Sequence, residues 1–177
     1  RFYFPKGIIS QSGEAKEKAY RYNATIGMAT AGGVPMSLPC VRNQLPGLTE
    51  EEIFPYAPTT GVNSLRKLWR RDMDDKNPSL TGKLTSLPLV TTGLTHGIST
   101  LADMFLDKGD TVLVPDMYWG NYNLIFEGKA EAKIRTFRFF NDQGKLDIPA
   151  VKEAVDSLAG KKVVLVLNFP NNPTGYS

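Results

Sequence analysis

Polar and ring-constrained residues follow the most apolar run of the sequence, a pattern typical of a loop that presents a binding side chain. The run from Val163 to Leu167 has the composition of a strand covered on both faces. Asn168 to Gly175 follows it, and its two prolines fix their own backbone angles and keep the preceding residues extended. Such a stiff turn can aim the amide of Asn172 at a ligand. Because a structural turn needs only one proline, we interpret this segment as a binding loop.

A second segment combines glycine with hydroxyl side chains directly before a predicted helix. Gly93 permits a tight turn, and the amides of Gly93, Leu94 and Thr95 then face an anion at the helix N-terminus. The segment lacks both G-x-x-x-x-G-K-[ST] and G-x-G-x-x-G, which disfavours a nucleoside triphosphatase and a dinucleotide fold. It predicts a phosphate cup of another kind or, alternatively, an ordinary strand-to-helix turn. The nearby His96 is given no ligand role.

Tyr118 and Trp119 follow a third predicted strand. A flat aromatic side chain at a strand end can stack on a flat cofactor ring, although ordinary core packing is the alternative.

Predicted strands and helices alternate along the part of the chain that carries these loops. The strands are 84–91, 111–114, 132–139 and 163–167, and the helices run from 63 or 64 to 74, 95–106, 119–127, and from 147 or 149 to 158. This alternation predicts an α/β fold with a mainly parallel sheet, whose ligands bind at the carboxyl ends of the strands. Residues 1–50 are expected to be irregular, with short helices at 14–21 and 50–53.

Composition excludes several other classes of function. A net charge of +3, evenly spread, is too small to indicate a nucleic-acid partner. One cysteine and one histidine exclude a disulfide framework and a metal site rich in these residues. The uncharged stretches Tyr22 to Val41 and Leu84 to Ala102 are as long as a membrane span, but glycine and proline interrupt both. We therefore expect no membrane segment, no metal and a cytoplasmic location.

The sequence NFPNNPTGY at 168–176 resembles the Asn-Pro-x-Gly motif of the class I/II aminotransferases, which are fold-type-I pyridoxal-5′-phosphate enzymes. Other segments resemble elements of that family in the same order, over about residues 20–177. They are Ile26-Gly27, Tyr56 to Gly61 with Leu65-Arg66, Thr91 to Thr95, and Pro115 to Tyr122. The W-G-N-Y stretch at 119–122 is most similar to aspartate aminotransferases, and it leans towards aspartate-like or aromatic amino-acid substrates.

The resemblance implies a fold and a role for each matching residue. The fold is an aminotransferase-like large domain, incomplete here, with residues 51–177 as its first half and residues 1–50 as an N-terminal arm or small-domain segment. Pyridoxal 5′-phosphate would be the cofactor. The implied cofactor contacts are the phosphate for Gly93, Leu94 and Thr95, ring stacking for Trp119 (or Tyr118), the ring's phenolic oxygen for Asn172 and the partner subunit's phosphate for Tyr56. The implied substrate-binding residues are Gly27, at the substrate carboxylate, and Asn172.

The family's catalytic lysine has no counterpart in this stretch. The resemblance places the Schiff-base lysine, and the arginine that binds the substrate carboxylate, beyond Ser177, so no residue here is assigned a catalytic role. Since the chain starts at Arg1 rather than Met and stops just after the motif, we expect an N-terminal part that is inactive alone.

Transamination between an amino acid and a 2-oxo acid, by a homodimer, is the activity that the resemblance implies for the whole protein. Two alternatives stay open: a related lyase or decarboxylase, because fold and cofactor do not fix the reaction, or a non-catalytic domain that senses the cofactor.

Overall fold

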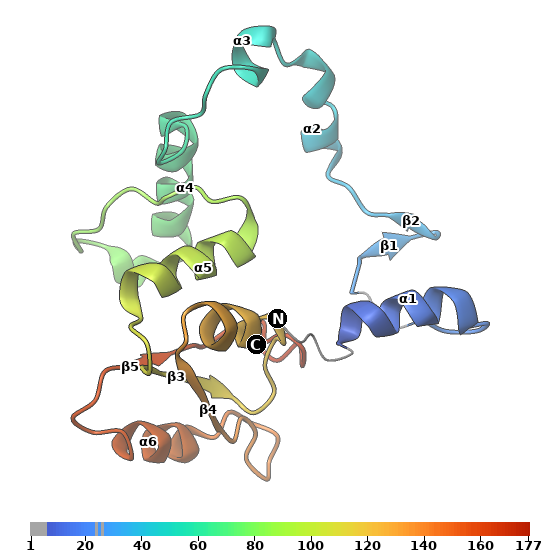
Figure 1. The fold of residues 1–177 in the computed structure, drawn as a ribbon. Helices are drawn as coiled ribbons and strands as arrows, with labels where there is room; N and C mark the ends of the chain where they lie inside the picture. The colour runs from blue at the N-terminus through green and yellow to red at the C-terminus, as the bar shows by residue number, and fades with distance from the viewer. Residues whose placement is uncertain (1–6, 24, 26) are drawn as a thin grey trace. The chain divides into compact units, whose positions relative to one another are not determined.

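The structure is a computed structural model that describes residues 7–23, 25 and 27–177. The chain divides into two compact units, residues 1–59 and 60–177, which are described separately below (Figure 1). The domain boundary that the sequence suggests between residues 50 and 51 stays a prediction.

The first unit consists of short elements joined by exposed segments. They are helix α1 (Ile8–Lys18), the antiparallel hairpin of β1 (Thr30–Ala31) and β2 (Val34–Pro35), helix α2 (Pro39–Arg42), the 3-10 turn η1 (Leu45–Gly47) and helix α3 (Glu50–Ile53). The turn predicted at 50–53 is confirmed. Thr49 and Glu52 form a capping box there, in which the Thr49 amide donates to the Glu52 carboxylate over 2.9 Å.

The second unit contains a three-stranded parallel sheet in the order β4-β3-β5. Strand β3 (Thr111–Pro115) pairs with β4 (Lys133–Phe137) along one edge and with β5 (Val163–Leu165) along the other. The helical elements of this unit are α4 (Asn63–Lys76), the 3-10 turn η2 (Pro78–Leu80), α5 (Gly93–Phe105), the π-helix η3 (Asn123–Lys129) and α6 (Ile148–Asp156). The predicted α/β fold with a parallel sheet is confirmed.

Strand β3 separates two apolar clusters, because its alternate side chains point to opposite faces. Val112 and Val114 pack with the α5 and η3 layer, in a cluster that includes Ala102, Tyr122, Ile125 and Phe126. Leu113 packs on the other face, in a cluster with Phe137, Phe139 and Leu158 beneath α6. Figure 1 shows α5 and α6 on opposite sides of the sheet.

Two predicted strands differ from those observed. Residues 84–91 form no strand, because no other strand pairs with them in the described part of the chain; Leu84 and Leu89 are exposed. The apolar run at 163–167 forms only the short β5, which is half-buried to exposed rather than covered on both faces. Among the described residues, β5 has a neighbouring strand on one side only, whereas β3 lies between two strands and is buried along its whole length.

The predicted helices are observed with shifted bounds. Helix α4 begins after Val62 without a side-chain cap, not at an Asn63 or Ser64 cap, and extends past Asp74 to Lys76. Its surface carries two i,i+4 ion pairs, Arg70–Asp74 and Asp72–Lys76, which stabilise an exposed helix modestly. The helix predicted at 119–127 is observed mainly as η3. Helix α1 covers residues 8–18 instead of 14–21.

Gly61 and Arg66 attach residues 87–90 to the start of α4. Gly61 has φ +96°, and a Cβ built there would lie 2.3 Å from the Val90 Cγ2. The Arg66 guanidinium donates to the Pro88 carbonyl over 2.7 Å and to the Thr60 hydroxyl over 2.9 Å. The Val90 amide donates to the Thr60 carbonyl. These contacts hold the extended segment without a strand ladder.

Asp147 begins α6 and is 3% exposed. Its carboxylate accepts a hydrogen bond from the Ala150 amide (3.0 Å) and pairs with the Arg138 guanidinium (2.6 Å). The Ala150 hydrogen bond lowers the pKa of the Asp147 carboxyl below its ordinary value, with a smaller contribution from Arg138, while burial opposes the shift. The charged form of Asp147 is therefore part of the folded structure.

Among the described residues, no helix is both long enough and apolar enough to cross a bilayer.

Gly61→Ala should destabilise the protein by about 2–4 kcal/mol, because it adds positive-φ strain to a clash with Val90. Gly109→Ala is the matched control, since Gly109 has φ +86° and open space around its Cβ position. It should cost only the strain, about 1–2 kcal/mol. Urea unfolding measures both, and equal losses would contradict the close contact between Gly61 and Val90.

Asp147→Asn should make stability less dependent on pH in acid. The folded-state pKa of Asp147 is lowered, so its charge stabilises the fold above the unfolded value of about 3.9, and this contribution is lost as the pH falls through the folded value. The variant should be less stable than the wild type at pH 7, and the difference in stability should begin to narrow below about pH 4 and close only below the folded-state pKa of Asp147. Asp142→Asn is the control, because Asp142 also pairs with Arg138 but is 94% exposed. Urea unfolding midpoints across the pH range measure the stability of each variant. A difference in stability between Asp147→Asn and the wild type that does not narrow in acid would refute the lowered pKa of Asp147.

Candidate functional site

The carboxyl ends of β3 and β5 lie side by side, because the two strands are parallel and in register, with Thr111 opposite Val163. The segment 116–122 leaves β3, and the segment 166–177 leaves β5. The Asn171 side-chain amide donates to the Met117 carbonyl over 3.4 Å and so joins the two segments. Two of the three loops selected from the sequence are thereby brought together, as expected for the carboxyl edge of a parallel sheet.

The two adjacent asparagines of the β5 loop have opposite environments. Asn171 is 3% exposed, and its side chain bonds Thr174 within the loop and Met117 in the segment that follows β3. Asn172 is exposed, and its side chain forms no hydrogen bond with any residue that the structure describes. The peptide bonds before Pro170 and Pro173 are both cis. The residue selected from the sequence is therefore the one whose amide is available to a ligand.

The aromatic pair after β3 divides in a similar way. The Tyr118 ring stacks on Tyr122, with centroids 6.2 Å apart, and its hydroxyl donates to the Asn123 side chain over 2.8 Å. Trp119 is half-buried; it meets Tyr122 edge to face at 5.7 Å and packs against the cluster under α5 and η3. Burial raises the pKa of the Tyr122 hydroxyl. Since both ends of Tyr118 have partners, Trp119 is the freer of the two rings.

The N-terminus of α5 lies towards the same edge of the sheet. Helix α5 ends at Phe105, and residues 106–110 lead directly into the amino end of β3. The N-terminus of the helix is at its other end and therefore lies towards the carboxyl end of that strand (Figure 1). Lys129 fixes the helix to η3 by contacts of 2.6 Å to Ser99 and to Asp103. Topology thus places the third predicted loop near the other two.

The amides at the start of α5 are only partly available. Gly93 has φ +79°, and its amide donates to the Thr91 carbonyl over 2.9 Å. The Thr92 amide donates to His96 Nδ1 over 3.0 Å, so the histidine caps the helix. Leu94 and Thr95 are exposed, and the amides of a first helical turn have no partner within the helix. The remaining donors are therefore the amides of Leu94 and Thr95 and the Thr95 hydroxyl.

Asp116 attaches the β3 loop to the end of β4. Its amide donates to the Phe137 carbonyl (2.8 Å), and its carboxylate accepts from the Phe139 amide (3.1 Å). These two hydrogen bonds of Asp116 fix the backbone that leads to Trp119.

The other predicted site residues belong to the first unit. Tyr56 is fully exposed, and Gly27 has open space around its Cβ position. Ile26, the neighbour of Gly27 in the motif, lies outside the described residues. Their roles stay predictions.

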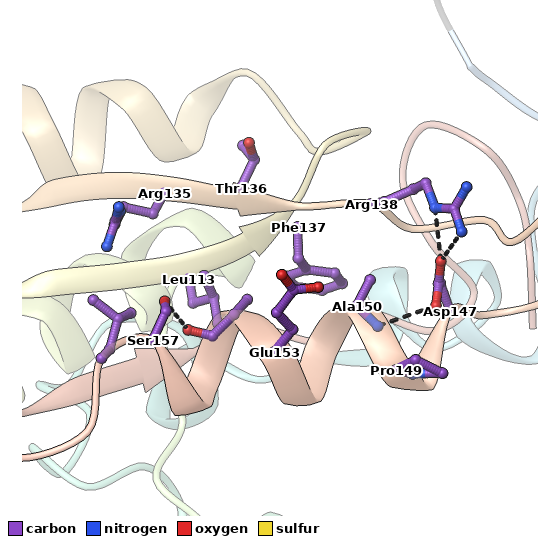
Figure 2. Close-up of a pocket in the computed structure, with 12 residues that line it drawn as sticks. Leu113, Arg135, Thr136, Phe137, Arg138, Asp147, Pro149, Ala150, Glu153 and Ser157 are labelled. Atoms are coloured by element: carbon purple, nitrogen blue, oxygen red, sulfur yellow. Dashed lines mark hydrogen bonds and ion pairs between the residues drawn. The ribbon is translucent and has the colours of Figure 1, made fainter.

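A cavity of about 520 Å³ lies elsewhere, between β4 and α6, and includes none of the predicted site residues. Figure 2 shows the Arg138–Asp147 pair at one end of it, with Phe137 on the strand side and Glu153 and Ser157 on the helix side. Its buried charge is already paired. We therefore locate the candidate site at the carboxyl edge of the sheet and not in this cavity.

Sequence reasoning missed Asn171, Met117 and Asp116, which support the site through hydrogen bonds to other parts of the protein. The signal for Asn171 was the doubled asparagine before Pro173, since two identical adjacent side chains on a tight turn seldom face the same way. Nothing in the sequence marks Met117, because it contributes only its carbonyl.

Known proteins resemble this chain over most of its length. Residues 28–177 match the family model "Aminotransferase class I and II". The chain is 26% identical to the aspartate aminotransferase of Bacillus subtilis (strain 168), over 97% of this chain and 42% of that protein. It is 31% identical to the LL-diaminopimelate aminotransferase of Dehalococcoides mccartyi, over 68% of this chain and 30% of that protein.

A solved structure of an aminotransferase from Anaerococcus prevotii DSM 20548 superposes with a TM-score of 0.80 at 30% identity, covering 96% of this chain and 42% of that one. The chain thus spans less than half the length of these relatives. The family match includes the β3 and β5 loops and the start of α5, and therefore every element of the candidate site in the second unit. The chain belongs to the class I and II aminotransferase family.

Proposed function

We propose that the whole protein transfers the amino group of an amino acid to a 2-oxo acid, with pyridoxal 5′-phosphate as cofactor. The observation that supports this most is the exposed Asn172 amide, which lies on a loop bonded to the segment that carries Trp119. A flat ring with one acidic oxygen and a phosphate arm needs a stacking partner, a donor to that oxygen and amides for the phosphate.

The residues present fit that cofactor. Asn172 would donate to the phenolic oxygen of the ring, and Trp119 would cover one face of it. The phosphate would bind the amides of Leu94 and Thr95 and the Thr95 hydroxyl; Gly93 would contribute the turn, since its own amide is bonded to Thr91. The cofactor, when bound, supplies an electron sink for charge that develops at the substrate's α-carbon.

The chain's own residues bind and orient the ring rather than move protons. A hydrogen bond from Asn172 to the ionised phenolic oxygen favours its charged form. Trp119 would stack on the ring and hold its plane in one orientation. The proton-transferring lysine of the proposal is a residue of the whole protein outside this sequence.

We further propose that Tyr56 and Gly27 complete the site in a homodimer. The Tyr56 hydroxyl would reach the phosphate bound by a partner subunit, which suits a side chain that is fully exposed. Gly27 would let a substrate carboxylate approach the backbone, which suits its open surroundings. The names of two relatives specify aspartate and LL-diaminopimelate, so amino donors with a second carboxylate are the first to test.

The whole protein, supplied with pyridoxal 5′-phosphate, should show a near-visible absorbance band that shifts on addition of L-aspartate, LL-diaminopimelate or an aromatic amino acid. Return of the band should require 2-oxoglutarate, because transamination leaves the amino group on the cofactor, whereas a lyase or decarboxylase returns the cofactor to its starting form without a 2-oxo acid. D-aspartate is the control for nonspecific reaction. Absence of any band with the cofactor in excess would refute the proposal.

Asn172→Ala should raise the pKa of the bound ring's phenolic group, because the lost hydrogen bond favoured the ionised form. It should also weaken cofactor binding by up to about tenfold, the effect of one hydrogen bond. Asn168→Ala, in the same loop, is the matched control. Titration of the absorbance band against pH measures the shift. If both variants titrate like the wild type, Asn172 has no contact with the ring.

A further inference from the structure

The loop after β5 holds two adjacent residues of one type in opposite environments. Asn172 is exposed and unbonded within the described part of the chain, whereas Asn171 is almost completely buried. A buried side-chain amide is stable only if its donors and acceptor find partners. The partners of Asn171 therefore indicate what it does.

The Asn171 side chain closes its own loop through its oxygen. Oδ1 accepts from the Thr174 amide over 3.1 Å and from the Thr174 hydroxyl over 2.8 Å. The backbone of Asn171 adds two short bonds, from its own amide to the Tyr176 carbonyl and from the Gly175 amide to its carbonyl, both 2.7 Å. Residues 171–176 are thus held as one rigid turn.

The nitrogen of the same side chain connects this turn to the other half of the site. Nδ2 donates to the Met117 carbonyl, two residues before Trp119. One planar group therefore bonds the turn that carries Asn172 on one side and the segment that carries Trp119 on the other. A side chain that only closed the turn would need its oxygen alone.

We infer that Asn171 is a positioning residue, which fixes the direction of the Asn172 amide relative to the Trp119 segment. This inference rests on the proposed function, because the ring that both residues would contact is part of that proposal. Asn171 itself touches no ligand in this arrangement. Its effect on the ring is transmitted through Asn172, and Thr174 acts with it because its hydroxyl holds the Asn171 oxygen in place.

Asn171→Asp tests the hydrogen bond to Met117 separately from those to Thr174. It keeps the shape of the side chain and an oxygen for Thr174 but removes the donor to Met117. In the whole protein, the dissociation constant of pyridoxal 5′-phosphate should rise about tenfold, and the phenolic pKa of the bound ring should rise as well. Asn168→Asp makes the same chemical change in the same loop, where the structure gives that side chain no hydrogen bond, and so controls for the added charge.

A second pair of variants tests the network without charge and with little risk to folding. Thr174 is exposed, so Thr174→Val should lower the unfolding temperature by no more than about 2 °C. It removes the hydroxyl that holds Asn171, and it should move the ring's pKa in the same direction as Asn171→Asp. Thr174→Ser keeps the hydroxyl and should restore the wild-type titration.

The readouts are cofactor binding, followed by quenching of tryptophan fluorescence, the pH titration of the absorbance band, and the unfolding temperature. A raised pKa in Asn171→Asp and Thr174→Val, with Asn168→Asp and Thr174→Ser like the wild type, is the expected result. If the wild type binds the cofactor and the Asn171 and Thr174 variants titrate like it, the positioning role is wrong while the proposed function stands. A fall in unfolding temperature with an unchanged titration also overturns it. Failure of the wild type to bind the cofactor would overturn the proposed function, and this inference with it.

Discussion

Strand β3 is the element on which the second unit depends, because it is enclosed on every side. All of Thr111–Pro115 is buried, both faces are covered by apolar clusters, and both edges pair with parallel strands. A buried backbone must satisfy its polar groups through such pairing. Parallel pairing on both edges in turn forces the loops after β3, β4 and β5 to emerge at one edge. The candidate site is a consequence of this enclosure.

Two kinds of interaction then fix those loops in place. Asp116 ties the β3 loop to the end of β4, and Asn171 ties it to the β5 loop, both with buried or half-buried hydrogen bonds. Aromatic packing anchors the far end of the β5 loop, where Tyr176 contacts Phe139 edge to face at 5.6 Å and its hydroxyl accepts from the Leu146 amide. The β5 loop is therefore held at both ends, and Asn172 lies between the anchors.

Patterns that depend on local chemistry could be predicted from the sequence, and patterns that depend on neighbours could not. The turn at 50–53 and the helix capped by Asp147 follow from capping residues and helical spacing, and the structure has both. The run at 163–167 and the segment at 84–91 are both predicted as strands, yet one forms a short edge strand and the other none. The composition of a segment indicates that it can form a strand. Whether it does so depends on a pairing strand that lies elsewhere in the chain.

The same distinction limits what sequence can say about the site. Asn172 could be selected because a proline-stiffened loop after a strand is a local signal, and Trp119 because it is aromatic at a strand end. Asn171 has the same chemistry as its neighbour, and only burial separates their roles: the exposed amide keeps its hydrogen bonds for a ligand, and the buried one must use them inside the protein. Gly61 is a further example, since the Val90 side chain that excludes a Cβ there belongs to a distant segment. In this fold, the residues that support the site are those whose polar groups or volume are already committed to other parts of the chain, and three-dimensional contacts are needed to find them.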